Sequence, residues 1–121
     1  MPKRVMIVDD ALFMRATLRD VFESANWKII AEASRGEQAI AEYKTYQPDL
    51  VIMDIVMPEM GGIDAMKRIL ADYPDAQIIV CSALGQNNLI LEAVNAGARD
   101  FIVKPFNRAQ VLEVAERVIA E

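Results

Sequence analysis

The sequence predicts an α/β fold in which helices cover a parallel β-sheet, and three observations support it. Short apolar runs alternate five times with stretches of helical periodicity, which is the pattern of successive βα units. Most of these runs are continuously apolar and rich in β-branched residues, as in strands buried on both faces of a parallel sheet. The 121 residues contain no linker or repeat, so we expect a single domain over residues 1–121.

The first two βα units lie before Pro48. The first strand is the apolar run Val5–Val8, and the helix that follows it has one apolar face. The apolar positions of that face are Met14, Leu18, Val21, Phe22 and Ala25. Trp27–Ala31 alternates as a partly exposed strand does, a turn at Ala33–Glu37 begins the second helix, and Pro48 ends it.

The third unit begins with the apolar run Leu50–Met53, which ends at Asp54. A loop over Val56–Gly62 leads into a helix at Ile63–Leu70, where apolar residues resume the helical period. Pro74 closes this segment because proline cannot continue a helix.

The last two units complete the predicted sheet. The fourth strand covers Gln77–Ser82, and a helix follows at Asn87–Ala96 with Gly97 as its C-cap. The fifth strand covers Arg99–Val103 and precedes a final helix whose apolar positions run from Val111 to Ile119.

Polar residues with related chemistry stand at the ends of four predicted strands. Asp9 and Asp10 follow the first strand, Asp54 follows the third, and Ser82 and Lys104 come at the ends of the fourth and fifth. The carboxyl ends of parallel strands share one edge of the sheet, where ligands of open α/β folds bind. An acidic pair or a serine alone often caps a helix, and a lone lysine is often just solvated. Their joint placement favours a functional site.

The charges at this edge predict a cation. Asp9, Asp10 and Asp54 carry three negative charges, and Lys104 returns one positive charge. Hard oxygen ligands in an incomplete cage suit Mg²⁺, which commonly binds one or two carboxylates together with a phosphate. A phosphoryl group would then meet a metal ion, an ammonium and a hydroxyl donor. One carboxylate could act as the nucleophile and become an aspartyl phosphate.

Composition excludes several other classes of protein. The chain is 54% hydrophobic and 26% charged, no apolar stretch reaches the ~20 residues of a membrane span, and Met1–Arg4 lacks signal-peptide character. We therefore expect a cytoplasmic protein without membrane insertion. A net charge of −5 without a basic cluster argues against nucleic-acid binding. There is no histidine, and the single cysteine, Cys81, lies in a predicted buried strand, where a packing role is expected.

Five motifs carry a resemblance to a known family: Val8–Asp10, Asp10–Arg15, Met53–Asp54 with Met57–Pro58, Ser82–Ala83, and Phe101–Phe106. Together they resemble the receiver domain of two-component response regulators over the whole chain, and most closely the free-standing chemotaxis regulators of that family. The resemblance implies a flavodoxin-like (βα)5 fold, a doubly wound parallel sheet of five strands in the order 2-1-3-4-5. It also implies a signalling protein and not an enzyme.

The resemblance assigns roles around the predicted metal. Asp54 would accept the phosphoryl group, and Asp10 and Asp54 would bind Mg²⁺ directly. Asp9 would bind Mg²⁺ through water, and the carbonyl of Val56 would be the third protein ligand.

The resemblance also assigns the residues that would sense phosphorylation. Ser82 would hydrogen-bond a phosphoryl oxygen and Lys104 would pair with the phosphoryl group, often after a cis Lys-Pro bond. Phe101 takes the place of the switch aromatic. Val56 and Leu84 stand where side chains overlook the phosphoryl group, and because both are apolar we expect slow intrinsic dephosphorylation and a partner phosphatase.

The implied function is a phosphorylation-driven switch. A sensor histidine kinase of the chemotaxis type would supply the phosphoryl group, and a flagellar motor switch protein would be the target. The alternatives are a single-domain phosphorelay receiver or the receiver portion of a larger regulator. A haloacid-dehalogenase-type phosphatase is disfavoured because Val56 replaces its general acid, and a flavodoxin-like binding protein because acidic residues replace the phosphate loop.

The fourth predicted helix has one apolar residue away from its main apolar face. At about 100° per residue, Ile90, Ala93 and Val94 share an arc toward the sheet, with Leu89 at the margin. Leu91 falls outside this arc. Isolated exposed leucines are common, but this helix belongs to the surface that receivers present to targets, so we expect Leu91 to be an anchor for a partner.

Overall fold

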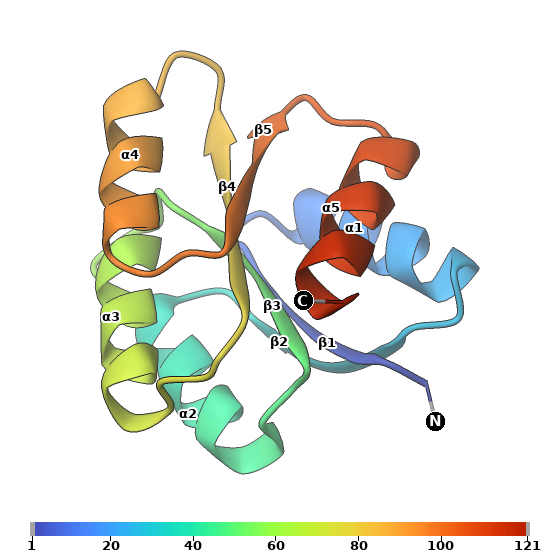
Figure 1. Cartoon of the computed structure of the whole chain (residues 1–121), viewed down its shortest axis with the longest axis horizontal. Coiled ribbons are helices and arrows are strands. Elements are labelled where there is room, and N and C mark those ends of the chain that lie inside the picture. Colours follow the sequence, from blue (N-terminus) through green and yellow to red (C-terminus); the bar gives the residue numbers. More distant parts are fainter. Residues whose placement is uncertain (1, 121) are drawn as a thin grey trace.

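The computed structural model describes residues 2–120 and contains one five-stranded parallel sheet in the order β2-β1-β3-β4-β5 (Figure 1). This confirms the predicted fold class and strand order. In chain order the elements are β1 (Arg4–Val8), α1 (Leu12–Ser24), β2 (Lys28–Ala33), α2 (Gly36–Tyr46), β3 (Leu50–Asp54), α3 (Gly62–Asp72), β4 (Ile78–Ala83), α4 (Asn87–Asn95), β5 (Asp100–Lys104) and α5 (Arg108–Ala120).

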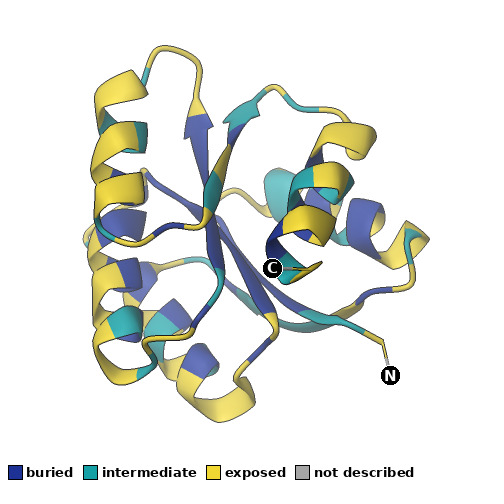
Figure 2. Ribbon diagram, viewed as in Figure 1, coloured by how far each residue is buried: buried dark blue, intermediate teal, exposed yellow. Residues whose placement is uncertain are grey.

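Helices cover both faces of the sheet. Figure 1 shows α2, α3 and α4 on one side of the strands and α1 and α5 on the other. The buried apolar residues form two clusters, one under each helical layer. In Figure 2 the central strands β1, β3 and β4 are buried along most of their length, the edge strands β2 and β5 are only partly buried, and each helix turns an exposed face outward. None of the helices within residues 2–120 is long and apolar enough to cross a membrane.

Alternation along each central strand explains why its sequence is continuously apolar. In β1, Met6 and Val8 belong to the cluster under α2–α4, whereas Val5 and Ile7 belong to the cluster under α1 and α5. Successive side chains of a strand point to opposite faces. Every position of a strand covered on both sides therefore has to be apolar.

Some element boundaries differ from the predicted ones by a few residues. β2 begins at Lys28 instead of Trp27 and continues to Ala33. α4 ends with Ala96 as its C-cap, and Gly97 is the next residue, with φ of 119°. The amide N–H groups of Gly97 and Ala98 donate to the carbonyls of Val94 and Ala93, which is a Schellman ending. The left-handed conformation at this ending favours glycine.

The prediction that Val94 faces the sheet is wrong. Ala93 is fully buried and Leu89 and Ile90 pack against the core, whereas Val94 is 42% exposed. The buried arc is centred on Ala93, so Val94, about 100° farther around the helix, lies beyond it. Leu91 is 61% exposed, as the sequence indicated.

Candidate functional site

The polar residues predicted at the strand ends meet at the carboxyl edge of the sheet. Asp9 directly follows β1, while Asp54 and Lys104 are the last residues of β3 and β5. One oxygen from each of Asp9, Asp10 and Asp54 lies within 4.8 Å of the others. The ends of two neighbouring strands, β1 and β3, thus bring three carboxylates together.

Lys104 joins two of these carboxylates. Its Nζ donates a hydrogen bond of 2.9 Å to Oδ2 of Asp9 and lies 3.3 Å from Oδ1 of Asp54. The Lys104–Pro105 peptide bond is cis, as expected from the family resemblance. The ammonium therefore lies between the side chains that follow β1 and end β3.

Asp9 is held on both of its carboxylate oxygens. Oδ1 accepts a hydrogen bond of 2.9 Å from the backbone N–H of Ala11, and Oδ2 accepts the bond from Lys104. Only 2% of Asp9 is exposed, whereas Asp10 faces solvent. The cluster therefore has a buried, rigid side at Asp9 and an open side at Asp10.

Burial and neighbouring charge shift the ionisation of the site. Burial, with the negative charge of Asp9, raises the pKa of Asp54 to about 6, although Lys104 acts in the opposite direction. Burial alone would lower the pKa of Lys104, but the hydrogen bond to Asp9 and the charges of Asp54 and Asp9 raise it. An additional cation would relieve the repulsion among the carboxylates.

Two buried residues at the end of β4, Cys81 and Ser82, stand on the strand that pairs with β3 and β5. Ser82 is completely buried, and among the described residues its Oγ has no hydrogen-bond partner. A buried hydroxyl without a partner is costly, so such groups often mark a ligand site. Cys81 is also buried, and burial raises the pKa of its thiol to about 12, which agrees with the predicted packing role.

Comparison with known proteins identifies the family. The model of the response regulator receiver domain matches residues 5–116. The chain belongs to the response regulator receiver family. It is 52% identical to a chemotaxis protein CheY of Thermotoga maritima over 118 residues, which cover 98% of each chain. A CheY of Bacillus subtilis is 48% identical over 119 residues, covering 98% of this chain and 99% of the relative.

A solved structure extends this similarity to three dimensions. CheY in a crystal structure of a CheX-CheY-BeF3-Mg²⁺ complex from Borrelia burgdorferi superimposes with a TM-score of 0.95 at 38% identity. The match covers 100% of this receiver chain and 92% of the other chain. This receiver is thus similar in sequence and fold to chemotaxis regulators.

The donor set of this receiver fits a magnesium ion. Three carboxylates with oxygens within 4.8 Å of one another are hard ligands, and the exposed Asp10 leaves one side open to water. The unpartnered hydroxyl of Ser82 supplies a donor for an anion at the same edge. The carbonyl of Val56, two residues beyond Asp54, stays a prediction as the third protein ligand.

Several large apolar side chains, in the loops and elements that follow or include the site strands, are exposed. Val56 and Leu84, which the resemblance places over the phosphoryl group, are both exposed. Leu12 and Phe13, in the first turn of α1 after Asp10, are even more exposed than Val56. Phe101, the predicted switch residue on β5, is 40% exposed.

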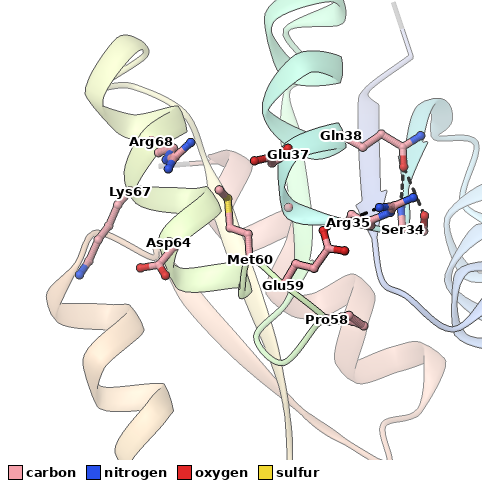
Figure 3. Close-up of a pocket in the computed structure, with 11 residues that line it drawn as sticks. Ser34, Arg35, Glu37, Gln38, Pro58, Glu59, Met60, Asp64, Lys67 and Arg68 are labelled. Carbon is pink, nitrogen blue, oxygen red and sulfur yellow. Dashed lines mark hydrogen bonds and ion pairs between the residues drawn. The ribbon is translucent and has the colours of Figure 1, made fainter.

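A cavity of the receiver lies away from the acidic cluster. It has a volume of about 1030 Å³ and lies between the start of α2, the loop before α3, and α3 itself (Figure 3). Three basic residues and three acidic residues line it, and Arg35 pairs with Glu59 at 3.7 Å. Its charges balance, and it contains none of the predicted site residues.

Sequence reasoning assigned no role to Arg15, which lies next to the site. Its Nη1 donates a hydrogen bond of 2.7 Å to the backbone carbonyl of Asp9. The motif Asp10–Arg15 had contributed only to the family resemblance. A side chain that binds a carbonyl six residues earlier leaves no periodic signal in a sequence.

Proposed function

We propose that this receiver is a phosphorylation-activated switch in which Asp54 is the phosphoacceptor. The observation that carries the proposal is the position of the Asp54 carboxylate, 3.3 Å from the Lys104 ammonium and within 4.8 Å of the oxygens of Asp9 and Asp10. A carboxylate nucleophile, an ammonium and a divalent-cation site at one sheet edge are the parts that phosphoryl transfer requires.

In the proposed reaction, an oxygen of Asp54 attacks the phosphorus of a phosphohistidine on the donor kinase. The new P–O bond forms as the P–N bond breaks, and the imidazole leaves with the bonding electrons. Because the pKa of Asp54 is about 6, most of the carboxylate is ionised and nucleophilic at pH 7. Lys104 and Ser82 then stabilise the phosphoryl oxygens by charge and hydrogen bonding.

Mg²⁺, held by Asp10 and Asp54, by Asp9 through water and by the carbonyl of Val56, would supply charge neutralisation to the phosphoryl oxygens. The open side at Asp10 suits an ion that keeps several of its waters. The protein acts only on its own phosphorylation state and turns over no separate substrate.

The proposed partners follow from the similarity to chemotaxis regulators. The phosphoryl donor is a chemotaxis-type sensor histidine kinase, and the target is a flagellar motor switch protein in the cytoplasm. Phosphorylation alters the surface of α4, β5 and α5, where Phe101 is in part exposed. Since Val56 and Leu84 carry no polar group that could orient water, a partner phosphatase supplies that group.

Acetyl phosphate tests the acceptor directly. With Mg²⁺, the wild-type chain should gain one phosphoryl mass, and Asp54→Asn should gain none because it lacks the nucleophile. Asp64→Asn, an exposed position on α3, is the matched control and should be labelled like wild type. Labelling of Asp54→Asn at the wild-type rate would overturn the assignment. Binding of the phosphorylated form to motor-switch peptides, compared with phosphorelay domains, then distinguishes the chemotaxis role from a phosphorelay role.

A further inference from the structure

Arg15 connects the acidic site to the edge strand of the sheet. It lies in the first turns of α1, and its side chain is only 16% exposed. Nη1 donates to the Asp9 carbonyl at 2.7 Å, while Nε lies 3.4 Å from a carboxylate oxygen of Glu32 on β2. One guanidinium thus contacts both the residue after β1 and the neighbouring strand.

Both backbone groups of Asp9, its N–H and its carbonyl, have hydrogen-bond partners. Its N–H donates to the carbonyl of Ala33 at the end of β2, and its own carbonyl accepts from Arg15. The carboxylate of Asp9 receives hydrogen bonds from Ala11 and Lys104. The direction of that carboxylate therefore depends on a backbone that Arg15 helps to fix.

The two contacts of Arg15 need the shape of a guanidinium. Nε and Nη1 point in fixed, different directions, so one planar group can bind a carbonyl and a carboxylate together. A lysine at this position keeps the positive charge but offers a single ammonium. Substitution by lysine therefore separates the effect of charge from the effect of position.

We propose that Arg15 is a positioning residue for the metal site, which holds the backbone of Asp9 so that its carboxylate stays aligned with Asp54 and Lys104. This inference rests on the Mg²⁺ site of the proposed function. Outer groups that orient ligands commonly change metal affinity by about 10- to 100-fold when they are removed.

Arg19 provides a matched control one helical turn later. It pairs with the same Glu32 and with Glu23, whereas the contact with the Asp9 carbonyl belongs to Arg15. Arg19→Ala therefore removes a positive charge and a bond to Glu32 while the Arg15–Asp9 bond is retained.

The experiment is calorimetric titration of the full chain with MgCl2. Arg15→Ala should raise the Kd for Mg²⁺ about tenfold, and Arg15→Lys should raise it as well. Arg19→Ala should change it by no more than about twofold, because salt screens a surface charge. In the metal-free protein, the Ala11 amide, which donates to Asp9, should exchange its hydrogen faster in both Arg15 variants but not in Arg19→Ala.

Each other outcome overturns the inference in a distinct way. Wild-type affinity in Arg15→Lys together with a loss in Arg15→Ala would show that only charge matters. An equal loss in Arg19→Ala would assign the effect to Glu32. If Arg15→Ala does not fold, Arg15→Lys decides alone. Failure of the wild-type chain to bind Mg²⁺ would instead overturn the proposed function together with this inference.

Discussion

Charged residues at the amino edge of the sheet have hydrogen-bond partners, whereas those at the carboxyl edge carry unbalanced negative charge. At the amino edge, the backbone N–H of Arg4 donates to Oδ2 of Asp49, and its guanidinium donates to the carbonyls of Tyr46 and Gln47. Asp49 returns a backbone hydrogen bond to the Arg4 carbonyl. At the carboxyl edge, Lys104 pairs with only two of three clustered carboxylates, and the hydroxyl of Ser82 has no partner among residues 2–120.

The contacts at the amino edge stabilise the fold, whereas the unbalanced groups at the carboxyl edge suit the binding of a ligand. The guanidinium of Arg4 binds carbonyls at the end of α2, which would otherwise lack partners within the helix. The carboxyl edge keeps excess negative charge and a buried hydroxyl donor, which the cation and the phosphoryl group of the proposed function would satisfy. Removing a charged side chain at the amino edge should therefore lower the free energy of unfolding. Removing a carboxylate at the carboxyl edge should raise it in metal-free protein.

The largest effect is expected from Gly62→Ala, which breaks the packing behind the carboxyl edge. A Cβ atom at Gly62 would lie 2.0 Å from the backbone carbonyl oxygen of Asp54, so either α3 or the end of β3 has to move. We expect a loss of about 3 kcal/mol in the free energy of unfolding by urea denaturation.

The control is Gly85→Ala, in the loop after β4. A Cβ there meets nothing within 4 Å, but φ is +91°, so only backbone strain of about 1 kcal/mol is expected. Equal losses in both variants would show that contact with Asp54 has no special cost.

Asp54→Asn removes one negative charge from the carboxyl edge. Burial and the charge of Asp9 raise the pKa of Asp54 from 3.8 to about 6, so the folded state favours the protonated form. Stability from this group is complete below pH 4 and is lost as the pH rises through 6. With a chelator at pH 7, Asp54→Asn should therefore be more stable than wild type by about 2 kcal/mol.

Urea unfolding between pH 4 and pH 7 measures this dependence. The gain should shrink as the pH falls from 7 to 4, because Asp54 becomes protonated in the folded state and then begins to be protonated in the unfolded state. It should also shrink when Mg²⁺ is added to the wild-type chain. A variant that is less stable than wild type at pH 7 without metal would contradict the interpretation of this edge as strained.

At the amino edge, Arg4→Ala should have the opposite sign. Its hydrogen bonds to two carbonyls are lost, but the side chain is 35% exposed, so water replaces part of the interaction. We expect a loss of about 1 kcal/mol in thermal or urea unfolding and an unchanged Mg²⁺ affinity. A change in metal affinity would show that the two edges are coupled.

The sequence predicted the carboxyl edge well because strand ends can be found from local patterns. Asp9, Asp54 and Lys104 stand at the ends of apolar runs, and the parallel topology brings them together. That reasoning placed Lys104 against a phosphoryl group and did not predict that Asp9 is its nearer partner. Distances between side chains depend on register and rotamers, which apolar patterns do not encode.

The same limit explains the wrong placement of Val94 on α4. Helical spacing indicates which residues share a face, but how far the helix is rotated on the sheet is set by tertiary packing. Ala93, a small residue, is at the centre of the contact, and the larger Val94 is turned to solvent. Helical spacing alone could not show that the buried face centres on Ala93 and leaves Val94 out.

Leu91→Ser is expected to have the smallest effect on stability. It tests an exposed apolar surface on α4, which differs from the charged residues at both edges of the sheet. Leu91 is 61% exposed on α4 and borders a shallow depression of about 460 Å³ that also involves Asn88, Glu92 and Lys67. The change should leave the free energy of unfolding within about 0.5 kcal/mol. It should weaken binding of the phosphorylated chain to its target roughly tenfold, because an apolar anchor is lost.

Thermal unfolding and titration with a motor-switch peptide test the two parts of this prediction. Tyr46→Ser, at an exposed position of α2, is the control and should leave affinity unchanged. An isolated exposed leucine has no function in most proteins, so equal affinities of Leu91→Ser and wild type would assign Leu91 to that ordinary class. A large stability loss with unchanged affinity would show that Leu91 supports the core, and only weaker binding by a stable variant identifies a docking anchor.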